Sequence, residues 1–166
     1  MDINIKRLTD SATIPTKAHP SDACFDLYAD CPHATFSDFV FDEHGLNPRY
    51  IFDLEGVKIK PGESATINTG IATEIPEGYF AAVFCRSGMG IKRHLRLSNS
   101  VGIIDSHYRG EWVVCLHNDG DKNQIIHHGD RIAQFAILPV LDINLNEVNE
   151  LSNTDRSTGG FGSTGV

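Results

Sequence analysis

The sequence predicts an all-β sandwich or barrel, and three observations support this prediction. Short stretches of alternating apolar and polar residues recur along the chain, with turn-forming residues between them. Only one stretch has the pattern of a helix. The length of 166 residues fits one domain of ordinary size, and 40% hydrophobic residues suffice for a core. We therefore expect a single domain over residues 1–166.

The expected strands follow one another between turns. In residues 3–8, Ile3 and Ile5 share one face with Arg7, which is the period of two of a strand. Turns built on proline, glycine or asparagine are expected at 60–63, 75–79 and 118–121. The other expected strands lie within residues 25–29, 56–73, 78–85, 111–118 and 131–140.

The stretch CRSGMGIKRHLRL, residues 85–97, differs from these strands. Ser87 is a good N-cap, and the residues after it fit one or two helical turns that two glycines limit. We predict a short helix here.

Residues 31–55 stand apart because aromatic side chains alternate with polar ones. This pattern suits an extra hairpin, and HGLNP at 44–48 would supply its turn. We interpret the segment as an excursion from the single domain.

Charge and composition exclude several partners. A net charge of −8 argues against a general nucleic-acid or membrane binder, although a small phosphorylated ligand needs only a few local donors. No apolar run approaches the roughly 20 residues of a membrane helix, and the start has no signal-peptide core. Cys24, Cys31, Cys85 and Cys115 show no CxxC spacing, so we expect reduced thiols and a cytoplasmic protein.

Residues 85–90 offer an anion cradle. Arg86 can bridge phosphate oxygens, Ser87 offers a hydroxyl, and a helix start presents N–H groups with partial positive charge. The alternative is an exposed, capped helix with a surface arginine.

Residues 99–111, NSVGIIDSHYRGE, contain an apolar run that ends in a carboxylate. Asp105 at a strand end can hold a water and accept its proton, and Tyr108 follows three residues later. Asn99 can read a base edge, because its amide both donates and accepts. The alternative is a turn-capping aspartate beside a half-buried tyrosine.

Residues 128–137, HGDRIAQFAI, form a turn followed by a strand. Alternation places Ile132 and Gln134 on one face, and Ala133 and Phe135 on the other. Gln134 is a candidate buried hydrogen-bonding group. The alternative is an ordinary strand whose glutamine faces water.

The tail RSTGGFGSTGV, residues 156–166, combines glycines with hydrogen-bond donors. Glycines let backbone N–H groups approach phosphates closely, and Arg156, Ser163 and Thr164 add side-chain donors. Phe161 could cover a base. The composition is also typical of a frayed end. No stretch has metal-ligand spacing, and no Gly-Lys-Ser/Thr loop occurs.

Five short stretches, in this order, resemble the motifs of the dUTP diphosphatase (dUTPase) family of homotrimeric all-β enzymes. They are DACFDLYA (22–29), RSGMG (86–90), GIIDSHYRGE (102–111), GDRIAQ (129–134) and RSTGGFGSTG (156–165). The resemblance implies a distorted jelly-roll β-barrel with a C-terminal arm at about residues 152–166. In that family the arm is exchanged within a trimer, and each active site is shared by three subunits.

The resemblance also implies a reaction. dUTP would be hydrolysed to dUMP and pyrophosphate by water attack at the α-phosphate, with Mg²⁺ as the cofactor. Such a reaction keeps uracil out of DNA and supplies dUMP for dTMP synthesis. Mg²⁺ held mainly by phosphate oxygens and waters needs no cluster of protein ligands, and Asp26 would act near it through waters.

The third motif carries the reacting residues in this resemblance. Asp105 would orient and deprotonate the attacking water. Tyr108 would lie under the deoxyribose and leave no room for a 2′-hydroxyl. Asn99 would bind the uracil edge together with backbone groups of residues 99–104, among them those of Gly102 and Ile104.

The remaining motifs would hold the rest of the nucleotide. Phe161 of the arm would stack on uracil. The other substrate-binding residues implied by the resemblance are Arg86, Ser87, Gly88, Gln134, Arg156, Gly162, Ser163 and Thr164.

Several positions depart from the family pattern. Cys24 replaces a usual Gly, Cys85 a Pro, Gly90 an Ala and Ser157 a Gly, but the proposed chemical groups remain in place. Most compact members also lack residues 31–55. The aromatic residues of this insertion would pack on the barrel or on a neighbouring subunit, or they would dock a partner protein.

Two rival interpretations remain. dCTP deaminase resembles the same fold and motif order, but its catalytic glutamate falls at Cys115 of this chain, and Glu111 is out of register. A bifunctional deaminase-diphosphatase is disfavoured on the same ground. From another class, the protein could be a nucleotide-responsive binding protein that uses the 31–55 insertion as its contact surface.

Overall fold

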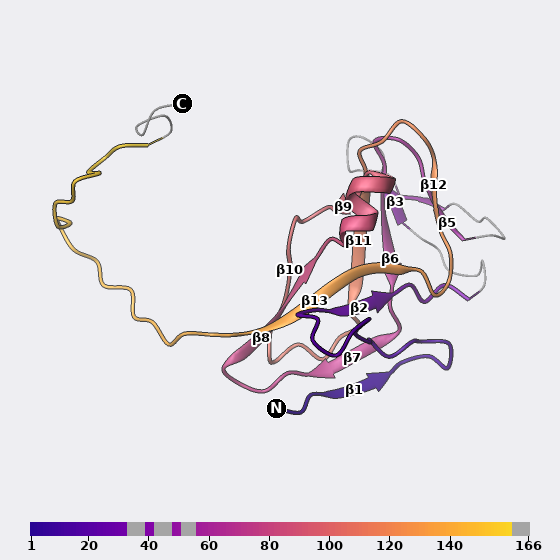
Figure 1. Cartoon of the computed structure of the whole chain (residues 1–166), viewed down its shortest axis with the longest axis horizontal. Coiled ribbons are helices and arrows are strands. Elements are labelled where there is room, and N and C mark those ends of the chain that lie inside the picture. The colour runs from indigo at the N-terminus through magenta and orange to yellow at the C-terminus, as the bar shows by residue number, and fades with distance from the viewer. Residues whose placement is uncertain (33–38, 42–47, 51–55, 161–166) are drawn as a thin grey trace.

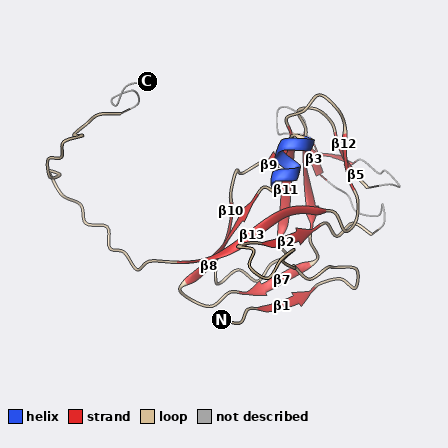
Figure 2. Ribbon diagram, in the orientation of Figure 1, coloured by secondary structure: helices blue, strands red, loops and turns tan. Residues whose placement is uncertain are grey.

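The computed structural model describes residues 1–32, 39–41, 48–50 and 56–160, and strands joined by turns make up the body of the molecule (Figure 1). The all-β prediction is confirmed. Figure 2 shows a short helical segment beside the strands. Within the described residues, no helix is long and apolar enough to cross a membrane. No disulfide joins the cysteines there, which agrees with the predicted thiols.

One sheet contains the strands β2 (Phe25–Tyr28), β8 (Tyr79–Phe84), β10 (Gly102–Ile104) and β13 (Arg131–Pro139). Their order is β10-β8-β13-β2, and every neighbouring pair is antiparallel. The last strand, β13, therefore lies between β8 and β2. As a result, the motifs at 22–29 and 129–134 lie side by side, and the motif at 86–90 follows directly after β8 on the other side of β13.

A second sheet contains the strands β3 (Phe39–Phe41), β4 (Pro48–Tyr50), β6 (Ser64–Asn68), β9 (Leu95–Leu97) and β11 (Val113–Asn118). Their order is β4-β3-β6-β11-β9. The hairpin predicted in the insertion is present as the antiparallel pair β3 and β4, and β3 also pairs with β6. The insertion thus extends a sheet of the body. Residues 44–47 of its predicted turn lie outside the described residues.

Two small sheets complete the fold. β1 (Asn4–Arg7) pairs with β7 (Ile71–Glu74), and β5 (Val57–Ile59) pairs with β12 (Gln124–Ile126), both antiparallel. Among the described strands no sheet closes on itself. The architecture is therefore of the jelly-roll type, built from open sheets instead of a closed barrel.

Side-chain alternation fills the core between the sheets. In β6, Ala65 and Ile67 are fully buried, whereas the residues between them are half-buried. Burial of a side chain such as Ile67 contributes about 1.5–3 kcal/mol. Phe135 stacks on Phe25 with ring centroids 5.5 Å apart and meets the edge of Trp112 at 5.0 Å. These aromatic contacts join the four-stranded sheet to the segment that precedes β11.

The predicted helix is present, but its predicted cap is wrong. The segment η1 (Gly88–Lys92) is a π-helix, and Ser87 precedes it without a side-chain capping hydrogen bond. An N-cap residue needs an extended backbone so that its hydroxyl can reach back to the first N–H groups. Ser87 has φ −53° and ψ −40°, which are helical values, so its hydroxyl does not cap the helix.

The predicted alternation in the last strand is wrong at its start. Ile132 and Ala133 are both fully buried, although they were expected on opposite faces. The pairing with β2 shifts register between Arg131 and Ala133, which is the signature of a β-bulge. A bulge turns two successive side chains toward the same side.

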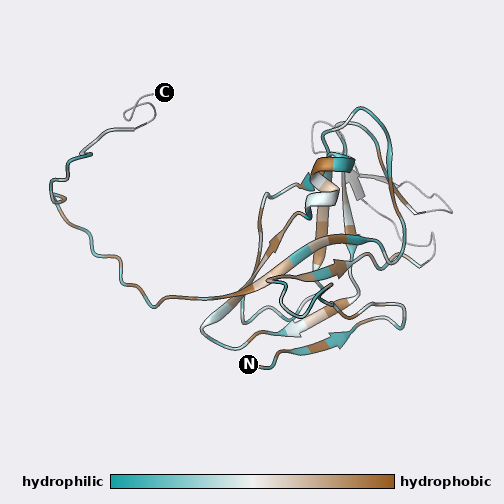
Figure 3. Ribbon diagram, in the orientation of Figure 1, coloured by the Kyte–Doolittle hydropathy of each residue, from teal (hydrophilic) through white to brown (hydrophobic). Residues whose placement is uncertain are grey.

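Beyond β13 the chain runs away from the body, as the orange to yellow trace in Figure 1 shows. Apolar residues recur in this segment, as Figure 3 also shows, with Leu141 77%, Ile143 68% and Leu145 92% exposed. Polar residues separate them, which is the pattern of a strand with one apolar face.

Candidate active site

Asp26 lies at the centre of a charged group on the four-stranded sheet. Its Oδ1 accepts a hydrogen bond from Arg86 Nε at 2.7 Å, and its Oδ2 accepts one from an Arg131 Nη1 at 3.2 Å. The Asp26 side chain is 10% exposed. Two guanidinium groups around one carboxylate leave a local excess of positive charge, which suits a phosphate group.

Strand register explains this assembly. Gln134 of β13 lies opposite Asp26 on one side and opposite Phe84 on the other. Arg86 follows two residues after Phe84, and Gln134 Nε2 donates a hydrogen bond to the carbonyl oxygen of Cys85 at 3.3 Å. The structure thus brings Asp26, Arg86 and Gln134 together from three stretches of the chain.

The start of η1 borders this charged group. Ser87 is exposed, and a Cβ added to Gly88 would meet nothing within 4 Å. The neighbouring Cys85 thiol donates to the carbonyl oxygen of Leu95 at 3.2 Å. Burial raises the pKa of the Cys85 thiol, with smaller opposing effects from hydrogen bonds to the thiol and from Arg86. The side facing solvent therefore carries a hydroxyl, backbone groups and a guanidinium, and its thiol is held in the neutral form.

Sequence reasoning gave no role to two arginines that support this group. Arg131 shares Asp26 with Arg86. Arg93 donates to the carbonyl oxygen of Ile125 at 2.5 Å, and its Nη1 lies 3.5 Å from an Asp130 carboxylate oxygen. Arg93 thereby ties η1 to the turn that begins β13. The place of Arg131 in the fourth motif was a usable signal, whereas nothing local marks Arg93.

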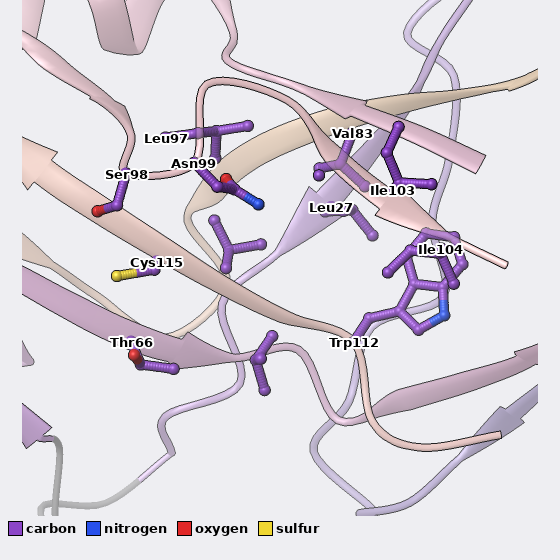
Figure 4. Close-up of a pocket in the computed structure, with 13 residues that line it drawn as sticks. Leu27, Thr66, Val83, Leu97, Ser98, Asn99, Ile103, Ile104, Trp112 and Cys115 are labelled. Atoms are coloured by element: carbon purple, nitrogen blue, oxygen red, sulfur yellow. The ribbon is translucent and has the colours of Figure 1, made fainter. Parts of the chain in front are cut away.

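A cavity of about 260 Å³ lies beside β10 (Figure 4). Asn99, Gly102 and Ile104 are among its lining residues, as are Trp112 and Cys115. Figure 4 shows the Asn99 amide directed toward the middle of the lining side chains. The absence of a side chain at Gly102 keeps this edge open, because a Cβ there would lie 3.2 Å from Val83 Cβ and 3.6 Å from Asn99 Nδ2. The cavity has the mixed apolar and amide lining that suits a small planar base.

Asp105 and Tyr108 follow β10 in an exposed turn. The Tyr108 N–H donates to the Asp105 carbonyl oxygen at 3.1 Å, which closes the turn. The Asp105 carboxylate is exposed, and no hydrogen bond or ion pair engages it among the described residues. Tyr108 is 44% exposed. A carboxylate and an aromatic face are therefore presented to solvent directly after the cavity.

Asp105 and Arg86 of one chain do not meet. Ile104, which precedes Asp105, pairs with Ala81, whereas Arg86 lies beyond Phe84 at the other end of β8. The strand from Ala81 to Phe84 spans about 10 Å at ~3.3 Å per residue. Because β10 runs antiparallel to β8, Asp105 and Arg86 lie beyond opposite ends of that span.

The tail also remains apart from these groups. Arg156 is exposed, and its Nε donates to the Gly159 carbonyl oxygen at 3.1 Å within the tail itself. The expected substrate-binding residues Phe161, Gly162, Ser163 and Thr164 lie outside the described residues.

Comparison with known protein families identifies the family of this chain. The family model of dUTPase matches residues 51–165, which is more than half of the chain. The chain belongs to the dUTPase family. The match includes four of the five stretches that carried the resemblance, and the expected family is confirmed.

Curated relatives agree with this assignment. The deoxyuridine 5′-triphosphate nucleotidohydrolase of Clostridium acetobutylicum is 39% identical over 166 residues, which is 100% of this chain and 98% of that protein. A protein of the same name from Hydrogenobaculum sp. is 52% identical over 110 residues, covering 66% of this chain and 76% of the relative.

Solved structures show the same fold. The dUTPase of Staphylococcus bacteriophage 80alpha with dUPNHPP superposes with a TM-score of 0.78. It is 27% identical to this dUTPase family member, and the alignment covers 99% of each chain.

Proposed function

We propose that this protein hydrolyses dUTP to dUMP and pyrophosphate with the help of Mg²⁺. The observation that carries the proposal is the order of groups along β10 and the turn after it. Asn99, Gly102 and Ile104 line a cavity, and Tyr108 and the exposed Asp105 carboxylate follow in the turn directly after β10. These are in turn a base site, a sugar-facing ring and a proton acceptor for water.

The chemistry needs little more than alignment and charge neutralisation. Asp105 takes a proton from water, and the hydroxide oxygen bonds to the α-phosphorus. The bond from this phosphorus to the bridging oxygen breaks, and pyrophosphate leaves with the bonding electron pair. Water attack on a phosphoryl group depends mainly on position and on stabilisation of spread negative charge. Arg86, Ser87, Gly88 and Gln134 supply donors for the phosphate oxygens in this proposal.

The residues present fit a Mg²⁺ ion that the substrate itself carries. Both Asp26 oxygens are engaged by arginines, so a direct bond to the metal would displace one of them. The described residues contain no cluster of three or more His, Cys, Asp or Glu side chains that could hold a metal. Asp26 would hold Mg²⁺ through waters, and the ion would supply positive charge that neutralises the phosphate oxygens.

We propose a homotrimer with shared sites, and the separation of Asp105 and Arg86 within one chain supports this proposal. Asp105 and Arg86 lie beyond opposite ends of the Ala81–Phe84 span, so an Asp105 from another copy would have to approach the Arg86 group. The exposed apolar residues Leu141, Ile143 and Leu145 support such an assembly, because a group of exposed apolar side chains is typical of an interface. The arm residues Arg156, Phe161, Gly162, Ser163 and Thr164 would then close over a neighbouring site.

The residues of the site do not support the dCTP deaminase alternative. Cys115 lines the cavity at the position where that rival needs a glutamate.

A regulatory role of the 31–55 insertion remains a second proposal. Its hairpin adds to the edge of the five-stranded sheet, where a partner could contact it. The 80alpha phage dUTPase, which is 27% identical, belongs to phage dUTPases that control the transfer of virulence genes. Deletion of 31–55 separates the roles: retention of a soluble, active trimer would exclude a structural role for the insertion.

One experiment tests the main proposal. The protein is incubated with Mg²⁺ and each deoxynucleoside triphosphate separately, and the products are resolved. We expect dUMP and pyrophosphate from dUTP alone. A deaminated product from dCTP would overturn the proposal, as would the absence of turnover with dUTP. A positive result would also support a role in keeping uracil out of DNA and in supplying dUMP for dTMP synthesis.

A further inference from the structure

The Tyr108 ring is held by the two residues that follow Arg109. Its hydroxyl donates a hydrogen bond to the Glu111 carbonyl oxygen at 2.9 Å. A Cβ added to Gly110 would lie 2.5 Å from Tyr108 Oη and 2.6 Å from Cζ. The backbone of Gly110 does not have a positive φ. The ring, and not the backbone conformation, therefore requires a glycine at this position.

Glu111 is in turn fixed to the body of the protein. Its Oε1 accepts a hydrogen bond from the Gly70 N–H at 2.8 Å. The next residue, Trp112, is 1% exposed, and its N–H donates to the Ile71 carbonyl oxygen at 2.9 Å. The Glu111 carbonyl group that accepts the hydrogen bond of the Tyr108 hydroxyl is thus flanked by two hydrogen bonds, one to Gly70 in the turn before β7 and one to Ile71 at the start of β7.

Such fixation is unusual for the side chain of a residue that is 44% exposed. Exposed side chains exchange rotamers within picoseconds to nanoseconds unless neighbouring groups hold them. Here Gly110 supports one side of the ring and Glu111 holds its hydroxyl. The exposed part of the Tyr108 ring therefore keeps one orientation. Recognition of a sugar by its shape requires such a fixed surface.

We propose that Gly110 and Glu111 are positioning residues, which fix the Tyr108 ring and thereby set the discrimination between dUTP and UTP. The sugar-facing role of Tyr108 in this inference rests on the proposed function. A mobile ring would lose its contact with the deoxyribose, and it would move aside and leave room for a 2′-hydroxyl. The specificity for deoxyribose would then belong to the loop and not to the tyrosine alone.

Three variants of the full-length protein test this inference. Glu111→Ala removes the anchor on Gly70, whereas Glu111→Gln keeps an amide oxygen as the acceptor and is the matched control. Gly110→Ala forces the ring to move by about 1 Å to reach an ordinary van der Waals contact. Tyr108→Ala gives the discrimination that remains without any ring.

The first measurement is the ratio of kcat/KM for dUTP to kcat/KM for UTP. We expect a fall of about tenfold in Glu111→Ala, about 100-fold in Gly110→Ala, and no fall in Glu111→Gln. A purely structural role would lower both kcat/KM values together and leave their ratio unchanged. Thermal unfolding identifies a variant that fails to fold, and the Glu111 pair still decides if Gly110→Ala is lost.

The second measurement needs no nucleotide. Aromatic ¹³C relaxation of the Tyr108 ring, assigned with Tyr108→Phe, should show an ordered ring in the wild type and Glu111→Gln but a mobile one in Glu111→Ala. Equal ring order in all three proteins would overturn the inference. An unchanged nucleotide ratio in folded Glu111→Ala and Gly110→Ala would also overturn it, provided Tyr108→Ala lowers the ratio. A wild type without dUTP turnover would instead refute the proposed function, and ring order would still decide whether Gly110 and Glu111 position the tyrosine.

Discussion

Asp26 shows how neighbouring charges define what one carboxylate can do. With Arg86 at 2.7 Å on one oxygen and Arg131 at 3.2 Å on the other, it acts first as an organiser of two guanidinium groups. Removal of such a carboxylate would leave the arginines free to repel each other and to leave the phosphate position. The sequence singled out Asp26 and Arg86, but it did not indicate that the two residues pair.

Cys85 makes a prediction about alkaline pH. Burial raises the pKa of its thiol above the ordinary value of 9.0. As pH rises, the unfolded chain loses this proton first, so the stability contributed by the neutral thiol is present below the unfolded pKa and is lost as pH rises toward the folded pKa. We expect the free energy of unfolding of the wild type to fall relative to that of Cys85→Ala as the pH rises above about 8.

Denaturant unfolding under reducing conditions measures this difference at several pH values. Below about pH 8 the difference between the two proteins should be constant, because the thiol is neutral in both states. A constant difference across the whole range would contradict the prediction.

At the scale of elements, Arg93 joins the π-helix η1 to β12 and to the turn before β13. Its Nε donates to Gln124 Oε1 at 3.0 Å, in addition to the contacts with Ile125 and Asp130. We expect Arg93→Met to lower the free energy of unfolding by about 1–3 kcal/mol, because hydrogen bonds from a charged donor are lost. The KM for dUTP should rise more than kcat falls, because the phosphate-binding helix becomes less well placed.

Arg93→Lys serves as the control for this prediction. A lysine keeps the charge near Asp130 but cannot form the same set of hydrogen bonds, so it should restore only part of the loss. Chemical denaturation and steady-state kinetics measure both effects. A KM unchanged in Arg93→Met would show that the helix keeps its position without this link.

The elements themselves were largely predictable, whereas their irregularities were not. Alternation located most of the strands and the hairpin of the 31–55 insertion, but β12 was not predicted and β9 lies in the stretch that was predicted to be helical. Alternation failed at Ile132, where a bulge against β2 buries two successive residues, and the capping prediction failed at Ser87, whose backbone is helical. Both features depend on which neighbour an element pairs with, and this information is not contained in the local sequence.

At the scale of the whole molecule, shared sites make a prediction about mixed assemblies. Asp105→Asn and Arg86→Ala should each be inactive alone, because each lacks one part of every site. When the two variants are coexpressed, about a quarter of the sites should combine an intact Asp105 from one copy with an intact Arg86 from another. We therefore expect turnover to reappear in the mixture.

Coexpression with a differently tagged wild-type chain provides the reference activity for mixed assemblies. Tandem purification through both tags selects complexes that contain both variants. If each site were built within a single chain, the mixture would stay inactive, and the proposed sharing would be wrong.

The tail makes a second prediction at this scale. Truncation before Arg156 removes residues 156–166. The hydrogen bond from Arg156 to Gly159 lies within this tail and does not involve the body of the protein. We expect the melting temperature and the oligomeric state to stay unchanged, while turnover falls by about 100-fold or more because donors and a base cover are lost. Light scattering, thermal unfolding and a pyrophosphate-release assay check these outcomes. Full turnover of the truncated protein would exclude a role of the arm in the reaction.

By itself, the sequence determined the strand content, the short helix and the residues that carry the family motifs. These properties depend on local alternation and on the chemistry of individual side chains, both of which are visible in a linear chain. Only the tertiary structure decided which of these residues meet. β13 lies between β8 and β2, which brings Asp26 to Arg86 and Arg131, 60 and 105 positions away in the chain. The antiparallel pairing of β10 with β8 sends Asp105 away from the same group. Strand order and register set these distances, and both result from the packing of the whole chain.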